Sequence, residues 1–184
     1  MAIPQFMIGA PIEAEGALAS APAGTELPTD AKTPLPEAFT AKAVLSDGGW
    51  SLNPNRQTTD IKIHGGGTAR TIAESYSEVV SAVIAESSDA EILKLVYGEK
   101  NVSVSGKKTT IKHNAKPNGK RVFTLGDIDG DAVRRLVIPE GELFVTGEIT
   151  HVHNDIIKYP VEIRCSQDKH GNSSYEYIED TSLD

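Results

Sequence analysis

Two stretches of the sequence contain residue types whose spacing could support chemistry. In the first, acidic residues alternate over Asp127-Ile128-Asp129-Gly130-Asp131, as they do in loops that bind calcium. An EF-hand loop requires glycine at its sixth position and glutamate at its twelfth. Here glycine is fourth and the twelfth residue is Ile138, so the stretch indicates an Asp-Gly turn rather than a calcium site.

The second stretch holds His151 and His153, which would share one face of a strand and could bind a metal with a third ligand. The remaining histidines lie in separate segments without ligand spacing: His64, His113 and His170. We therefore predict a histidine pair packed at the end of a strand, with no metal and no cofactor. Cys165 has no motif around it and falls on an apolar face, which predicts an inert core thiol.

The sequence offers no catalytic arrangement. The triple glycine Gly65-Gly66-Gly67 lacks the Lys-Ser/Thr of a phosphate-binding loop and precedes an extended run, so it predicts a turn. No order of Ser, His and Asp stands out, and no signature of paired carboxylates does either. We therefore expect a protein that is not an enzyme.

Composition and charge exclude further classes. The net charge of -8 over 184 residues argues against a partner held by phosphate contacts, which require clustered Lys and Arg. The single cysteine rules out a disulfide within the chain, and no apolar run approaches the roughly 20 residues of a membrane helix. The N-terminus lacks the basic start and apolar middle of a signal peptide, so we expect a protein that folds in the cytoplasm.

The elements that would position these residues are organised around Thr58 to Gly98. An alternating run over 60–64 meets the glycine turn, and a long extended run follows over 69–86, for which a helix is the alternative. Ser88 as N-cap and Glu91 three residues later form a capping box, and Gly98 is a stop signal. These signals predict one amphipathic helix, at about residues 88–97.

The rest of the chain predicts strands, turns and loops. Ser46-Asp47-Gly48-Gly49 and Asn53-Pro54-Asn55 indicate a loop that contains Trp50. The clearest strand has Leu143, Val145, Ile149 and His151 on one face. Other strands are expected at 39–45, 102–104, 109–111, 122–128, 134–138, 161–165 and 175–178, with turns at 105–107, 129–131, 139–141 and 170–172 and a polar loop at 113–120.

Composition suggests three regions. Residues 1–38 are rich in Ala, Pro, Gly and Thr, which predicts an N-terminal arm that is extended or disordered until assembly. Residues 39–178 form the predicted β domain, and residues 179–184 form an acidic C-terminal tail. The expected fold class is mainly β with one flanking helix.

Short motifs, in a fixed order, resemble those of a known family. The sequence resembles the major tail tube protein of long, flexible-tailed bacteriophages, in the version common among phages of actinobacteria. Two departures are His64-Gly65, where the family usually has Trp-Gly, and Lys42 to Leu45, where a Gly-Tyr pair is common. The matching motifs are Ala21-Pro22-Ala23-Gly24-Thr25, Leu27-Pro28-Thr29-Asp30-Ala31, Phe39, Ser46-Asp47-Gly48, Thr59-Asp60-Ile61-Lys62, Gly65-Gly66, Glu86 and Tyr97-Gly98.

The resemblance implies a β-sandwich or barrel-like tail tube fold and a structural role. Six copies would close into a ring whose inner sheets merge into a continuous barrel, and rings would stack around the tape measure protein to form a tube in the virion tail. Tail tip and tail terminator proteins would be further partners, and the tail would be assembled in the host cytoplasm. The genome would later pass through the bore, where an acidic surface would let DNA slide without specific binding.

This role suggests sites for assembly rather than for catalysis. Polar residues expected to line the bore are Glu74, Glu78, Glu142, Thr146, Glu148 and Thr150, and expected contacts between subunits are Trp50, Leu27 and Pro28. One alternative is the inner tube of a contractile injection system. Another is a monomeric β-sandwich binding module, which would need an exposed aromatic platform although aromatics are only 5% of the chain.

Overall fold

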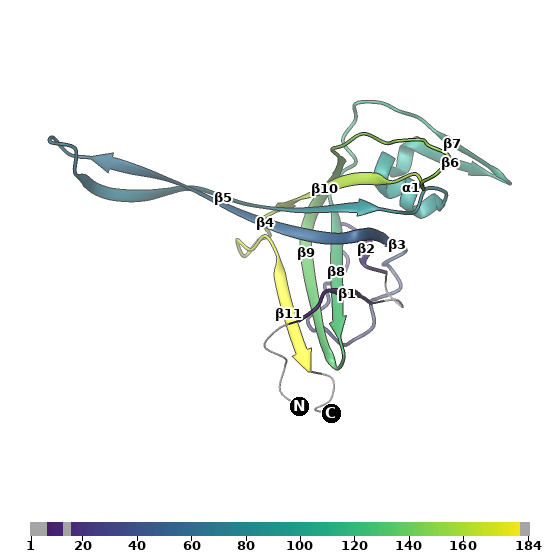
Figure 1. Ribbon diagram of the computed structural model, residues 1–184, viewed down its shortest axis with the longest axis horizontal. Helices are drawn as coiled ribbons and strands as arrows, with labels where there is room; N and C mark the ends of the chain where they lie inside the picture. Colours follow the sequence, from purple (N-terminus) through teal and green to yellow (C-terminus); the bar gives the residue numbers. More distant parts are fainter. Residues whose placement is uncertain (1–6, 13–15, 181–184) are drawn as a thin grey trace.

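The computed structural model describes residues 7–12 and 16–180, and it confirms a mainly β fold with one α-helix (Figure 1). The helix is α1, Ala90–Tyr97, followed by a short 3-10 helix, η1, at Glu99–Asn101. The strands are β1 (Ala10–Pro11), β2 (Leu18–Pro22), β3 (Ala41–Ala43), β4 (Leu45–Lys62), β5 (Thr68–Ile84), β6 (Val102–Ser105), β7 (Lys108–Ile111), β8 (Arg121–Asp129), β9 (Ala132–Val145), β10 (Tyr159–Ser166) and β11 (Tyr175–Asp180).

One hydrogen-bonded path joins most strands in the order β3-β2-β8-β9-β10-β5-β4, and β6 and β7 form a separate hairpin. Strand β9 belongs to two layers. Its first half pairs with β8 and β11, and its second half pairs with β10. In Figure 1 the strands β4, β5 and β10 run across β8, β9 and β11, so the sheet folds over itself in a sandwich-like manner. Residues from both layers meet in the core.

The bend in β9 depends on a glycine. A Cβ on Gly141 would lie 2.8 Å from Ile163 Cγ2 and 2.9 Å from Phe123 Cδ2, and both of these side chains are fully buried. The register with β8 shifts just before this point, where Arg121 pairs with Gly141 and Phe123 with Ile138. The predicted turn at 139–141 is therefore wrong: these residues form an irregularity inside a continuous strand.

Replacing Gly141 by alanine should destabilise the fold by about 2 kcal/mol, because the added methyl group overpacks the core. Urea denaturation followed by circular dichroism measures the effect. Gly48→Ala is the control, since no atom lies within 4 Å of a Cβ at that position. Equal midpoints for the two variants would contradict the close approach at Gly141.

The helix covers one end of the core with Ile92, Leu93, Leu95 and Val96, all of them buried. Asp89, rather than the predicted Ser88, is the N-cap: its carboxylate accepts hydrogen bonds from the amides of Glu91 (2.8 Å) and Ile92 (3.1 Å). The carboxylate also lies at the positive end of the helix dipole. The helix ends at Gly98, with φ 92°, as predicted.

Part of the predicted N-terminal arm belongs to the sheet. Residues 18–22 form β2 between β3 and β8, and Leu18, Ala19 and Ala21 are fully buried. The outer face of β2 and β8 forms a second cluster of Ala19, Ala21, Phe39 and Val122, against which Leu27 and Leu35 pack. Ala19 and Ala21 are small, so the segment that carries Leu27 and Leu35 can pack on them. The alanine-rich composition that predicted a free arm therefore contributes to packing. Residues 1–6 and 13–15 of that arm lie outside the described residues.

Two further predictions about the strands are wrong. The expected loop over 46–55 is part of β4, which contains Trp50 and Pro54 and is 18 residues long. The expected strand from Leu143 to His151 ends at Val145, and 146–158 form a loop. At the C-terminus, β11 extends to Asp180, so the predicted acidic tail begins two residues inside a strand; residues 181–184 lie outside the described residues.

Candidate assembly surfaces

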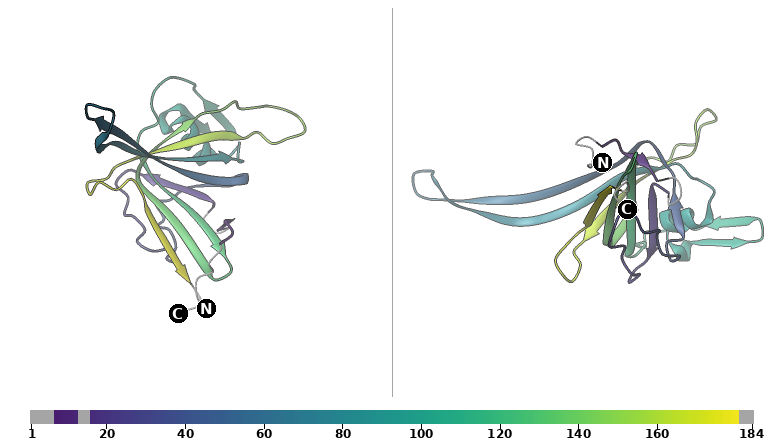
Figure 2. Two further views of the ribbon diagram at one scale, coloured as in Figure 1. Left: turned by 60° about the vertical axis from the view of Figure 1, so that its left-hand side comes forward. Right: turned by 90° about the horizontal axis from the view of Figure 1, so that it is seen from below.

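The largest exposed feature is the hairpin formed by the far halves of β4 and β5, residues 53–77. It projects away from the body of the molecule (Figures 1 and 2), and every one of its residues is exposed. Apolar side chains on it include Ile61 (46% exposed), Ile63 (58%) and Ile72 (41%). Exposed isoleucines spaced along one projecting ribbon are typical of a contact surface.

Polar cross-strand contacts hold the two strands of the hairpin together. The Thr71 hydroxyl donates to Asp60 Oδ1 at 2.6 Å, and Lys62 Nζ donates to Thr68 Oγ1 at 3.1 Å. Gln57 pairs with Ser75 but Thr58 pairs with Ala73, so Glu74 is an extra residue at a β-bulge. The predicted turn at the triple glycine is confirmed, with positive φ at Gly65 and Gly66 and a 2.8 Å hydrogen bond from Ile63 N to Gly67 O.

At the base of the hairpin, Glu78 is buried rather than presented to solvent. It accepts hydrogen bonds from Tyr76 Oη and, at 2.6 Å, from Ser174 Oγ. The hydrogen bond to Glu78 raises the pKa of Tyr76 above its usual value. Burial, with Glu78 nearby, raises the pKa of Cys165 to about 12, so the thiol is protonated and unreactive at neutral pH.

The layer formed by the second half of β9 with β10, β5 and β4 has two different faces. Leu143, Ile163 and Val80 are in register on the core face and are buried. On the outer face Glu142 is in register with Arg164, whose guanidinium lies 4.9 Å from the Phe144 ring centre. The predicted bore residues are therefore divided: Glu142 lies on the outer face and Glu78 on the opposite one.

The other predicted bore residues lie elsewhere. Glu74 is on the hairpin, and Thr146, Glu148 and Thr150 are exposed in the loop that follows β9. His151 and His153 belong to the same loop and are exposed, so the predicted packing of this pair at a strand end is wrong. Within residues 7–12 and 16–180, no three side chains of His, Cys, Asp or Glu come together as metal ligands.

The predicted subunit contacts pack against their own chain. Trp50 is partly buried, and its indole Nε1 donates to Asp127 Oδ1 at 3.1 Å. Burial raises the pKa of Asp127 above the usual carboxylate value. Leu27 packs on the second cluster, and Pro28 is buried. The sequence pattern did not indicate the hairpin as a surface. Asn53-Pro54-Asn55 favours a loop, so the pattern gives no sign that β4 is 18 residues long.

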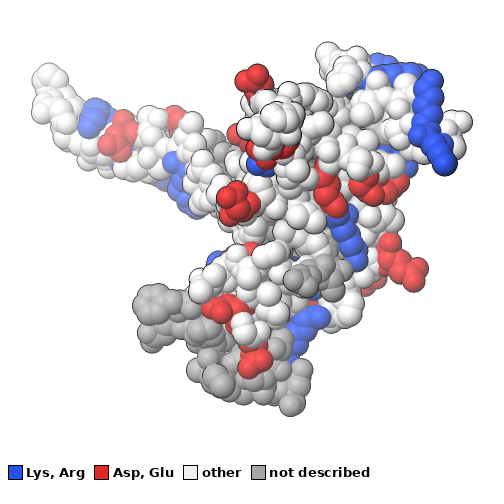
Figure 3. All heavy atoms as spheres, turned by 45° about the vertical axis from the view of Figure 1, so that its right-hand side comes forward, with Lys and Arg blue, Asp and Glu red and all other residues white. Residues whose placement is uncertain are grey.

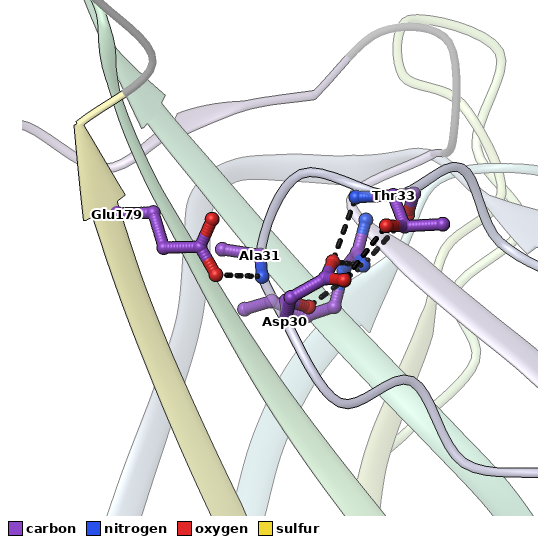
Figure 4. A network of polar contacts seen from close by, with 5 residues as sticks. Asp30, Ala31, Thr33 and Glu179 are labelled. Carbon is purple, nitrogen blue, oxygen red and sulfur yellow. Dashed lines mark hydrogen bonds and ion pairs between the residues drawn. The ribbon is translucent and has the colours of Figure 1, made fainter. Parts of the chain in front are cut away.

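A buried arginine fixes the segment that contains Leu27 and Pro28. Arg135 Nη1 donates to the carbonyl oxygens of Asp30 and Thr33, both at 2.9 Å, although only 2% of its side chain is exposed. Figure 4 shows Asp30 bonded to Thr33, and Glu179 of β11 accepting from Ala31 N at 3.1 Å. The hydrogen bonds from Thr33, assisted by the Arg135 charge, lower the pKa of Asp30.

Charge is unevenly distributed over the surface. Figure 3 shows Lys and Arg side chains gathered around the end that carries β6 and β7, which lies away from the hairpin in Figure 1. Exposed lysines on β6 and β7 and on the segments that flank them are Lys100, Lys107, Lys108, Lys112 and Lys116. Since the whole chain carries -8, the remaining surface is strongly acidic.

Exposed isoleucines on a projecting hairpin, and a long strand with one edge unpaired among the described residues, are features expected of a subunit that makes contacts with other molecules. A family model described as phage tail tube protein matches residues 11–183, so the chain belongs to the phage tail tube protein family. Members are structural components of the virion tail and not enzymes. A search of curated proteins finds no match. No helix within the described residues is long and apolar enough to cross a membrane.

Proposed function

We propose that six copies of this chain close into a ring and that the rings stack to form the tube of a phage tail. The observation that supports this most is the hairpin of residues 53–77, which projects from the body with exposed isoleucines. Such a surface requires a partner, and identical copies supply one. A closed ring that also stacks head to tail builds a filament from one kind of subunit.

The face proposed for the bore is the outer face of β9, β10, β5 and β4. Glu142 and Glu162 lie on it with Arg164, and Ser51 and Ser81 add polar surface. A wall with few cations displaces few counterions from DNA, so the genome can pass without being held. Glu78 does not belong to this lining, because it is buried on the core face. Thr146, Glu148 and Thr150 follow directly from the β9 end of this face.

In the virion the tube would enclose the tape measure protein and end at the tail tip and tail terminator proteins. Delivery of the genome into the host cell would then use the emptied bore. Membership of the phage tail tube protein family supports these partners as part of the proposal.

Sedimentation velocity and negative-stain electron microscopy of the purified chain at rising concentration test the proposal. We expect hollow tubes with sixfold rings in projection. A chain that stays monomeric at every concentration would favour the monomeric binding module instead.

A phage that carries Glu142→Lys and Glu148→Lys tests the bore. We expect infectivity per tailed particle to fall about tenfold or more, because about a dozen glutamates per ring would be replaced by about a dozen lysines that attract DNA phosphates. Glu26→Lys with Glu37→Lys is the matched control, since these exposed glutamates lie on the segment that covers the other layer. Unchanged infectivity of the first variant would place its two residues outside the bore.

A further inference from the structure

Glu78 lies at the point where the hairpin of residues 53–77 leaves the body of the molecule. The pairing of β10 with β5 ends at Cys165 and Glu78, and from there to the glycine turn β5 pairs with β4 alone. Among the described residues, only Tyr76 forms a side-chain hydrogen bond that leaves the hairpin, and its acceptor is Glu78. A two-stranded ribbon is marginally stable by itself, so contacts at this branch point decide the direction in which the hairpin projects.

The Glu78 carboxylate joins the hairpin to a second part of the chain. Its Oε1 accepts a hydrogen bond from Tyr76 Oη, and its Oε2 accepts one from Ser174 Oγ at 2.6 Å. Ser174 belongs to the connection between β10 and β11. Tyr76 also contacts Arg56 of β4, whose guanidinium carbon lies 5.3 Å from the ring centre. One carboxylate thus links both strands of the hairpin to the body.

The connection that carries Ser174 is a firm support for this link. Asp168 Oδ1 accepts hydrogen bonds from the amides of His170 (2.8 Å) and Asn172 (3.0 Å). Asp168 Oδ2 accepts one from Tyr175 Oη at 2.7 Å. These hydrogen bonds close the turn before Ser174 and tie it to the start of β11, so the Ser174 hydroxyl has a fixed place from which to donate to Glu78.

The stability of the fold does not explain a carboxylate at this position. Only 9% of Glu78 is exposed, and none of the ion pairs among the described residues includes it. A buried carboxylate without a cation costs free energy that an apolar side chain of similar size would not. Its two donors do not depend on it, because Tyr76 is 39% exposed and Ser174 is partly exposed, so water can take its place.

We propose that Glu78 is a positioning residue, whose carboxylate holds the hairpin at the angle from which its exposed isoleucines meet the next copy. This inference rests on the proposed function. It separates two properties of the subunit, because loss of the carboxylate should leave the fold intact and release the hairpin.

Spin labels measure the direction of the hairpin in the monomer. In a Cys165→Ala background, labels at His64→Cys in the glycine turn and Ile178→Cys on β11 give the distribution of distances between hairpin and body by double electron–electron resonance. We expect Glu78→Met to widen this distribution at least about twofold, because a segment with fewer contacts to the body moves more. Glu26→Met, the same exchange at an exposed position, should leave it unchanged. An unchanged distribution in Glu78→Met would overturn the inference.

Assembly and thermal unfolding separate positioning from a structural role. Glu78→Met should raise the concentration needed for tube formation at least about tenfold, while its Tm stays at or above that of the wild type. Glu26→Met should change neither. Tubes at the wild-type concentration would overturn the inference, and so would a lower Tm for Glu78→Met, since the carboxylate would then support the fold itself. A wild-type chain that forms no tubes contradicts the proposed function instead, and the distances in the monomer still test Glu78.

The two hydrogen-bond donors provide an independent check. Tyr76→Phe with Ser174→Ala should widen the distance distribution as Glu78→Met does, but it should lower the Tm, because the carboxylate stays buried without hydrogen bonds. Adding Glu78→Met to this pair should restore the Tm and leave the distribution wide. A wild-type distribution in the pair variant would show that these hydrogen bonds do not direct the hairpin, which would overturn the inference.

Discussion

A chain in which residues 58–74 are replaced by Asn-Gly should fold as a stable monomer and form no tubes. Gln57 and Ser75 are paired in the hairpin, and Asn-Gly is the preferred two-residue connection between paired antiparallel strands. Every residue removed is exposed, so no core contact is lost. We therefore expect the free energy of unfolding to stay close to that of the full chain. Sedimentation velocity and electron microscopy measure assembly, and thermal unfolding measures stability.

Point variants assign this effect to the isoleucines of the hairpin. Ile61→Asp with Ile72→Asp should prevent assembly as the shortened chain does, because two charges would have to be buried in the contact. Ile61→Val with Ile72→Val is the matched control and should form tubes, since it keeps two branched apolar side chains. Tubes from the shortened chain would show that the hairpin is not an assembly surface.

Replacing Arg135 by methionine should destabilise the subunit by about 3 kcal/mol. The carbonyl oxygens of Asp30 and Thr33 would lose the hydrogen bonds that the Arg135 guanidinium donates. For a chain of this length that loss of stability corresponds to a fall in Tm of roughly 6–12 °C. Methionine keeps most of the volume, so the loss reports the polar contacts of Arg135, including its ion pair with Asp30, rather than a cavity. Calorimetry and urea denaturation measure it.

The neighbouring arginine provides the control. Arg135 forms an ion pair with Asp30 at 3.7 Å. Arg134 forms one with Glu176 at 2.7 Å, but there both side chains are more than a third exposed. Arg134→Met should therefore cost less than about 1 kcal/mol. If the two variants lost equal stability, the contacts of Arg135 with Asp30 and Thr33 would not be what fixes this segment to the sheet.

The sequence predicted those elements whose signals are local. The long strand over residues 69–86, the glycine turn before it and the helix that ends at Gly98 were all placed within a few residues. Alternation, positive φ at glycine and helix termination depend on neighbouring residues alone. The mainly β class followed because such signals recur along most of the chain.

The errors share a different cause. Asp47, Gly48 and Pro54 favour turns, yet β4 tolerates them because, among the described residues, one edge of this strand has no partner strand and imposes few hydrogen bonds. Pro139 likewise predicted a turn, although it is buried at an irregularity of β9. The arm was mistaken for a free segment because nothing local reveals that Arg135, more than 100 residues later, bonds to it. Only the tertiary structure brings these partners together.

The open edge of β4 has a consequence for how growth ends. If this edge pairs with a different surface of the next copy, the contact is head-to-tail, and such contacts have no built-in stopping point. Whether a closed circle or a lock-washer spiral results depends on the angle between successive copies. A few degrees of error per copy would leave the sixth subunit displaced from the first. We therefore expect circle closure to be guided by a template, with the preceding layer of the tail fixing that angle.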